Sequence, residues 1–313
     1  MTEHPLHRKT AIPWCAEYLT ENEPTPYAFV RETMHVFSRA VRNCRRPQGV
    51  TWVNDNELIM NNKTINLEAF CSFLHFQIQS LQDFLNEKVL FGFDLGELGI
   101  FINFHELGGH GDFTTIGHNP LLIGLEGNTD SKKFLNTLVE KGEVVSFKDG
   151  KLVWDMERAQ LWVANISQAV QNTYAIAHIT QGSPGRTTEE EKMQIANTPA
   201  TRRHLIVPPN LDTLAVWSNY WKGAKILGRF KEILRVFPRV VSNFIFILIR
   251  VVRPVEILFL AKHLVLASEH IKMTTAYGSS LWAGLGAPMQ SITMRASLAH
   301  FFGFAWGGWK PNF

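Results

Sequence analysis

The apolar residues between positions 66 and 85 recur every three or four residues, which is the spacing of one face of an α-helix. The residues on this face are Leu67, Phe70, Leu74, Ile78, Leu81, Phe84 and Leu85. Similar patterns predict further helices over residues 25–46, 131–141, 155–179, 240–249, 253–268, 279–285 and 292–304. The chain is therefore expected to be mainly helical.

Short runs of β-type residues interrupt these helices. Residues 50–53 and 58–65, separated by Asn54-Asp55-Asn56, predict one hairpin, and residues 144–153 predict a second around Lys148-Asp149-Gly150. Residues 204–207, 214–220 and 232–236 predict three short strands. The last two are joined by residues 221–229, a glycine-containing segment with three cations that we expect to form a flexible positive finger. The predicted fold class is α+β, mainly helical, with a short antiparallel sheet.

At 313 residues the chain exceeds the usual size of one domain. We expect a polar tail over residues 1–24, a helical N-terminal domain with short hairpins over 25–150, and a mixed domain over 151–313. The three cysteines are widely spaced, which favours reduced thiols in an intracellular protein. No secretory signal and no apolar run long enough to cross a bilayer are recognised, so no membrane association is expected.

A glycine-rich stretch over residues 92–127 holds four candidate metal ligands, His105, Glu106, His110 and His118. His105 and His110 are five residues apart, which misses the i, i+4 spacing of a metalloprotease helix, and Gly108-Gly109 would break a helix that carried them. The sequence therefore predicts no metal, and nothing in it indicates another cofactor.

The charge is distributed unevenly along the chain. Residues 1–200 carry 17 Lys and Arg against 24 Asp and Glu, and residues 201–313 carry 14 against 4, so a net charge of −7 precedes one of +10. Such a basic segment suits a polyanion, and double-stranded DNA is the partner we expect. A solvated basic face without a ligand is the alternative.

The loop His178 to Glu189 contains the most specific candidate chemistry. A glycine and proline turn precedes Arg186, and Glu189 follows three residues later. A guanidinium held by a carboxylate keeps donors free for a second partner, and phosphate fits its planar fork. A surface ion pair with no further role remains the alternative.

Three motifs in this order resemble the catalytic domain of tyrosine recombinases. They are Gly182-Ser183-Pro184-Gly185-Arg186-Thr187-Thr188-Glu189, the hairpin Lys222-Gly223, and Thr293-Met294-Arg295. The resemblance is closest to a fungal subset found beside RecQ-like helicase domains in telomere-linked and transposon-type proteins. It is carried also by Thr25-Pro26-Tyr27, Val50-Thr51-Trp52, Ser218-Asn219-Tyr220-Trp221 and Val252-Arg253-Pro254-Val255-Glu256. It implies a helical domain and a catalytic-type domain that clamp DNA, a nuclear location, and a helicase domain in a longer parent protein.

The chain also departs from the recombinase pattern. The family has a histidine or lysine three residues before the second arginine, where this chain has Ile292, and no tyrosine follows Tyr277. Strand cleavage needs that tyrosine as nucleophile, so we expect a degenerate, C-terminally incomplete domain that does not cut DNA. No phosphate-binding loop of a helicase motor is found.

The resemblance and the charge together give one set of candidate residues. Remnants of the catalytic set are Arg186, Glu189, Lys222 and Arg295, and contacts to nucleic acid are expected from Arg186, Arg202, Arg203, Lys222, Lys225, Arg229, Lys231 and Arg295. A DNA-binding module related to a mobile element is the first hypothesis. A structural or protein-interaction domain, in which Arg186 and Glu189 brace a loop and the basic surface meets an acidic partner, is the second.

Overall fold

A computed structural model describes residues 51–60, 63–107, 112–121, 129–182, 184–218, 232–263, 275 and 277–306. In these ranges the protein is mixed α/β, about half helical, with short antiparallel sheets. The predicted mixture of helices and short antiparallel strands is confirmed at this level. The helix predicted over residues 25–46 lies outside the described residues.

The chain divides into two compact units, residues 1–72 and 73–313. The described part of the first unit is a three-stranded antiparallel sheet in the order β1 (Thr51–Asn54), β2 (Glu57–Met60) and β3 (Lys63–Asn66). Helix α3 (Leu67–Phe84) follows directly, because the Asn66 side chain accepts a hydrogen bond from the Ala69 amide at 2.8 Å and so caps the first turn. The predicted long helix is confirmed, and so is the hairpin, as β1 and β2; the single run predicted over residues 58–65 is instead divided between two paired strands, β2 and β3.

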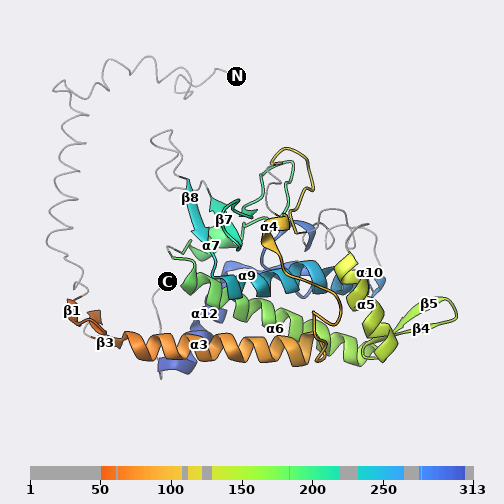
Figure 1. Ribbon diagram of the computed structural model, residues 1–313, viewed down its shortest axis with the longest axis horizontal. Coiled ribbons are helices and arrows are strands. Elements are labelled where there is room, and N and C mark those ends of the chain that lie inside the picture. Colours follow the sequence, from red (N-terminus) through yellow and green to blue (C-terminus); the bar gives the residue numbers. More distant parts are fainter. Residues whose placement is uncertain are drawn as a thin grey trace, which may run out of the picture. The chain divides into compact units, whose positions relative to one another are not determined.

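Helix α6 (Met156–Thr180) is the central element of the second unit (Figure 1). It begins where the Asp155 side chain accepts from the Arg158 amide, an N-cap that satisfies one free donor of the first turn. It packs against the π-helical turn η2 (Leu85–Val89), helix α9 (Arg239–Phe246) and helix α12 (Ser291–Trp306). Thirteen residues of α6 are buried, and they include the consecutive run from Thr173 to His178.

Three helical segments follow one another without a break from Arg239 to His263: α9, the π-helical segment η4 (Ile247–Val252) and α10 (Arg253–His263). The apolar periodicity predicts two α-helices here and gives no sign of the π-helical turns between them. Helix α5 (Thr129–Lys141) packs against η4, and it is followed by the hairpin β4 (Val145–Lys148) and β5 (Lys151–Trp154). Both were expected from the sequence.

The remaining strands form two small sheets. Strands β6 (Leu205–Ile206), β7 (Ala215–Ser218) and β8 (Ile233–Val236) pair antiparallel in that order, as predicted. The helix predicted over residues 279–285 is wrong, because β9 (Ala283–Gly284) pairs with β10 (Ala287–Pro288) across a turn in which Leu285 and Gly286 have positive φ. The described residues of this unit also contain two one-turn helices, α4 (Phe104–Leu107) and α7 (Thr187–Glu190).

One hydrophobic core runs through the second unit, from Leu81 in α3 to Phe301 in α12. It draws on residues from both sides of position 150, where the sequence suggests a domain boundary. The largest wholly buried side chains include Trp162, Tyr174 and Tyr277. None of the helices in the described ranges combines the length and the apolar character needed to cross a membrane.

Candidate nucleic-acid interface

The loop after α6 is anchored by a buried glutamate, Glu190, whose side chain is 1% exposed. Its Oε2 atom accepts from the Tyr174 hydroxyl at 2.7 Å and lies 2.8 Å from Nδ1 of His178, while its Oε1 accepts from Nε2 of Gln181 at 2.7 Å. A carboxylate only accepts hydrogen bonds, so His178 carries its proton on Nδ1. Burial, and then the negative charge of Glu190, raise the pKa of Tyr174, which keeps its hydroxyl a donor.

Helix α7 carries this glutamate and also docks on the start of α12. The side chain of the next residue, Glu191, accepts from the Ser291 amide at 2.7 Å, which is one of the free donors at the N-terminus of α12. On the other side, a Cβ on Gly185 would lie 3.1 Å from Cγ of Glu190, so the backbone runs close to the buried carboxylate. The loop is thereby fixed at both ends.

Arg186 is the exposed N-cap residue of α7, at the end of this loop. Its side chain is 64% exposed, and its Nε atom is 4.0 Å from Oε1 of Glu189. The Arg186 amide also donates to the Glu189 side chain at 3.4 Å. The predicted Arg–Glu pair is therefore present as a loose surface pair, and most donors of the guanidinium face solvent.

Arg295 lies in the first turns of α12, the helix that α7 contacts. Its side chain is exposed, and its Nε donates to the carbonyl of Ser291 in the same helix at 3.3 Å. Ile292, which stands where recombinases have a histidine or lysine, is 66% exposed. Two of the three predicted remnant cations thus lie on neighbouring elements. Lys222, the third, lies outside the described residues, as do Lys225, Arg229 and Lys231.

Arg202 borders a depression of about 370 Å³ that is lined also by Thr201, His204, Trp217 and Glu232. The arginine is exposed. Nδ1 of His204 accepts from the Gln194 amide at 3.0 Å, and burial lowers the pKa of this histidine. The ring is therefore neutral at pH 7 with its proton on Nε2, where it can act as a donor.

Arg203, the adjacent candidate, has a structural position. It is 4% exposed, and its guanidinium donates to the carbonyl of Asp112, lies 2.9 Å from Nδ1 of His118, and stacks 4.3 Å from the centre of the Phe113 ring. Burial lowers its pKa, an effect that the charge of Asp112 partly offsets. This side chain ties residues 112–118 to the strand region and does not face solvent.

Other basic side chains of residues 201–313 are engaged in the same way. Arg253 is buried and donates to the carbonyls of Ser280 and Leu281 at 2.9 and 3.1 Å. Arg239 donates to the carbonyl of Ile102 at 2.9 Å, and Arg250 to that of Leu121 at 2.9 Å. Among the basic residues of this segment that the structure describes, Arg202 and Arg295 are the exposed arginines.

Tyr277 is a second buried tyrosine beside a carboxylate. Its hydroxyl donates to Oε1 of Glu256 at 3.2 Å and accepts from the Gly286 amide. Burial raises the pKa of both groups, that of Glu256 to about 7. The hydroxyl is therefore engaged inside the fold.

Comparison with known proteins gave no match to a family model, to a curated protein or to a solved structure. The resemblance to tyrosine recombinases rests on its sequence motifs.

The residue that organises the loop, Glu190, was missed from the sequence, which singled out Glu189. A signal was present in the spacing of Tyr174, His178 and Gln181, which puts three polar groups on one face of the end of a long apolar helix.

Proposed function

We propose that the protein binds duplex DNA through its phosphate backbone, with Arg186 and Arg295 as central contacts and Arg202 as a further one. The observation that carries this proposal is the fixed loop of Arg186. Glu190 holds the loop from inside with three hydrogen-bonding partners, and Glu191 attaches it to α12. The backbone that carries Arg186 is thus held in place before any ligand arrives, and its guanidinium is exposed.

Preorganisation matters because an exposed arginine normally loses side-chain and loop freedom when it binds. A guanidinium on a fixed loop loses less, and its planar fork can bind two phosphate oxygens. Arg295, on the element next to α7, provides a second positive charge. The pair supports a role in holding a phosphodiester, as the resemblance to recombinases implies, and the proposal requires no strand cleavage.

Fluorescence anisotropy with a labelled duplex at several salt concentrations tests the proposal. We expect Arg186→Ala and Arg295→Ala each to weaken binding by roughly fivefold, which corresponds to about 1 kcal/mol for one charge-assisted contact. A plot of log K against log salt has a negative slope, and each variant should make this slope less steep by roughly 0.9, the contribution of one phosphate. Lys151→Ala is the matched control, because it removes an exposed cation from the β4–β5 hairpin.

A duplex that does not bind at low salt contradicts the proposal. Equal losses in the Lys151 control and in the Arg186 variant also contradict it, because they would reflect net charge and not a site.

The second candidate is a protein-interaction or structural domain. It is favoured by the internal bonding of Arg203, Arg239, Arg250 and Arg253, which removes much of the expected basic surface. In this case Arg186 and Glu189 form only a surface pair, and the labelled duplex does not bind at low salt.

A further inference from the structure

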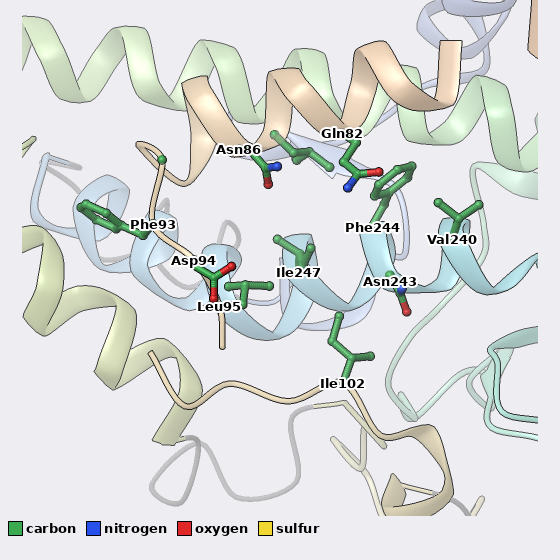
Figure 2. A pocket seen from close by; sticks show the side chains of 12 residues that line it. Gln82, Asn86, Phe93, Asp94, Leu95, Ile102, Val240, Asn243, Phe244 and Ile247 are labelled. Carbon is green, nitrogen blue, oxygen red and sulfur yellow. The ribbon is translucent and has the colours of Figure 1, made fainter. Parts of the chain in front are cut away.

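A second pocket, unrelated to the arginine loop, lies between the end of α3 and the facing helix α9 with η4 (Figure 2). Its volume is about 340 Å³, within the range of about 300–1,000 Å³ typical of small-molecule sites. The apolar wall consists of Leu85, Phe93, Leu95, Ile102, Val240, Phe244 and Ile247. Gln82, Asn86, Asp94 and Asn243 add polar groups.

The backbone around this pocket is irregular at three places. Leu85 and Asn86 begin the π-helical turn η2, and Ile247 begins the π-helical segment η4 on the opposite side. Phe91 has a φ of 56°, which is unusual for a bulky residue, and Gly92 beside it lines the pocket. π-Turns and residues in sparsely populated backbone regions cost stability and cluster at functional sites. Three such features around one pocket therefore indicate a binding site.

Three of the polar groups of the pocket keep hydrogen-bonding capacity for a ligand, whereas Oδ1 of Asn243 already accepts from Arg239 at 3.0 Å. Figure 2 shows the amides of Gln82 and Asn86 projecting from the α3 side into the gap in front of Phe244 and Ile247. Within the described ranges neither side-chain amide has a hydrogen-bond partner. Asp94 uses Oδ1 to accept from the Glu97 amide at 2.9 Å. Its second oxygen remains for a donor.

The charge around the pocket determines what can enter. Asp94 lines it and Asp83 is exposed on the adjoining turn of α3, while Glu87 and Lys88 on η2 form an exposed ion pair at 3.9 Å. Arg239 precedes the lining residue Val240; it donates to the carbonyl of Ile102 and to Oδ1 of Asn243, and its charge is paired with the Asp212 carboxylate. Asp94 is the charged residue among those that line the pocket, so an anionic ligand would meet a carboxylate and no lining cation.

We infer that this pocket binds a small, uncharged or cationic ring compound that carries an amide-like or amidine-like edge. A side-chain amide pairs with such an edge through one donor and one acceptor, as Asn and Gln do with adenine. A carboxylate accepts from an exocyclic amine, and the ring packs on Phe244 and Ile247. Nucleosides and aromatic amides share this chemistry. The inference is independent of the proposed DNA binding.

Methyl NMR on the full chain tests it, with the Ile102 and Ile247 methyl groups as reporters inside the pocket. The probes are adenosine, benzamide and adenosine 5′-monophosphate. We expect adenosine or benzamide to shift both methyl signals with a dissociation constant below about 1 mM. The monophosphate should bind several-fold more weakly than adenosine, because its charge faces Asp94. Binding of benzamide alone assigns the site to aromatic amides, and binding of adenosine assigns it to nucleosides.

Two variants and a control locate the effect. Asn86→Ala removes an amide without a partner in the described fold, and it should weaken binding by roughly fivefold. Val240→Phe fills the pocket from α9 and should abolish binding. Gln79→Ala removes an amide one turn earlier on α3, outside the pocket, and should leave binding unchanged.

Three results overturn the inference. One is the absence of methyl shifts with both adenosine and benzamide at about 10 mM. Another is unchanged affinity in both Asn86→Ala and Val240→Phe. The third is a monophosphate that binds as tightly as adenosine.

Discussion

Replacing Glu190 by alanine should destabilise the second unit far more than the same change at Glu189. Glu190 is buried and hydrogen-bonds with Tyr174, His178 and Gln181, whereas Glu189 is part-exposed and pairs loosely with Arg186. The two residues are neighbours in one short helix. Their comparison therefore isolates burial and hydrogen bonding from helix propensity and from net charge.

The magnitude follows from what the alanine leaves behind. Three buried partners lose their acceptor, and an unsatisfied buried polar group costs roughly 1–3 kcal/mol. Partial relaxation and entry of water reduce the sum, so we expect Glu190→Ala to lower the free energy of unfolding by about 3–5 kcal/mol, the range for breaking a buried charged network. Glu189→Ala should cost less than about 1 kcal/mol, as exposed pairs do. Tyr174→Phe removes one of the three donors and should fall between them.

Urea unfolding followed by tryptophan fluorescence measures these differences, because Trp282 packs against Tyr174 with ring centres 5.3 Å apart. The midpoint should shift strongly for Glu190→Ala and little for Glu189→Ala, at equal m-values. A loss below about 1 kcal/mol for Glu190→Ala, or equal losses for both glutamates, would refute the role of Glu190 as the anchor.

Two further predictions concern stability. Burial raises the pKa of Glu256 to about 7, above the unfolded value of 4.5, so its contribution to stability is full below pH 4.5 and is lost as pH rises towards 7. Relative to the Glu256→Gln variant, the natural protein should lose at most about 3 kcal/mol of unfolding free energy over that range. Urea titrations at pH values from 4.5 to 8 measure this loss. Unfolding free energies that change with pH in the same way in both proteins would contradict the prediction. Gly284→Ala should destabilise by about 1–3 kcal/mol, because the new Cβ would lie 2.7 Å from Oγ and 3.3 Å from Cα of Ser167 in α6. In the control Gly278→Ala, the new Cβ meets nothing within 4 Å. If the Gly278→Ala variant melts at as low a temperature as the Gly284→Ala variant, close packing is not the cause of the destabilisation.

The regular elements of the fold could be predicted from the sequence because their signals are local. Asn66 and Asp155 each stand directly before a segment whose apolar residues recur with helical spacing, and each caps the helix that the segment forms. Lys148-Asp149-Gly150 supplies the positive φ angles that a tight hairpin needs. Patterns of this kind need no knowledge of the rest of the chain.

The predictions that failed or fell short depend on contacts between distant segments. The apolar run over residues 279–285 has helical spacing, but pairing of Ala283 with Pro288 and the close approach of Gly284 to α6 form a hairpin instead. The π-helical turns add a residue to a turn, and apolar periodicity does not register a single extra residue. Which of three consecutive glutamates faces the core depends on how α7 docks, and a one-turn helix has too few residues to show a face.

The candidate site was predictable only in part for the same reason. The motif of Arg186 and Glu189 located the loop and the exposed cation correctly, because a glycine and proline turn before an arginine is a local feature. Net charge does not distinguish an exposed guanidinium from a buried one. Arg202 and Arg203 are adjacent in the sequence. Arg203 is buried against Phe113, whereas Arg202 is exposed.

Some of the arginines that give residues 201–313 their basic excess have a structural role. Their side chains hold irregular segments of the chain in place. Buried carbonyls outside helices and sheets need donors, and a guanidinium supplies five in a fixed plane. Arg253 bonds to Ser280 and Leu281 in this way, and Arg203 bonds to Asp112. Arginines with this role contribute to the charge count without contributing to a surface for a polyanion. Weaker DNA binding in an Arg253 variant would therefore reflect lost folding, whereas weaker binding in an Arg186 variant of unchanged stability would reflect a lost contact to phosphate.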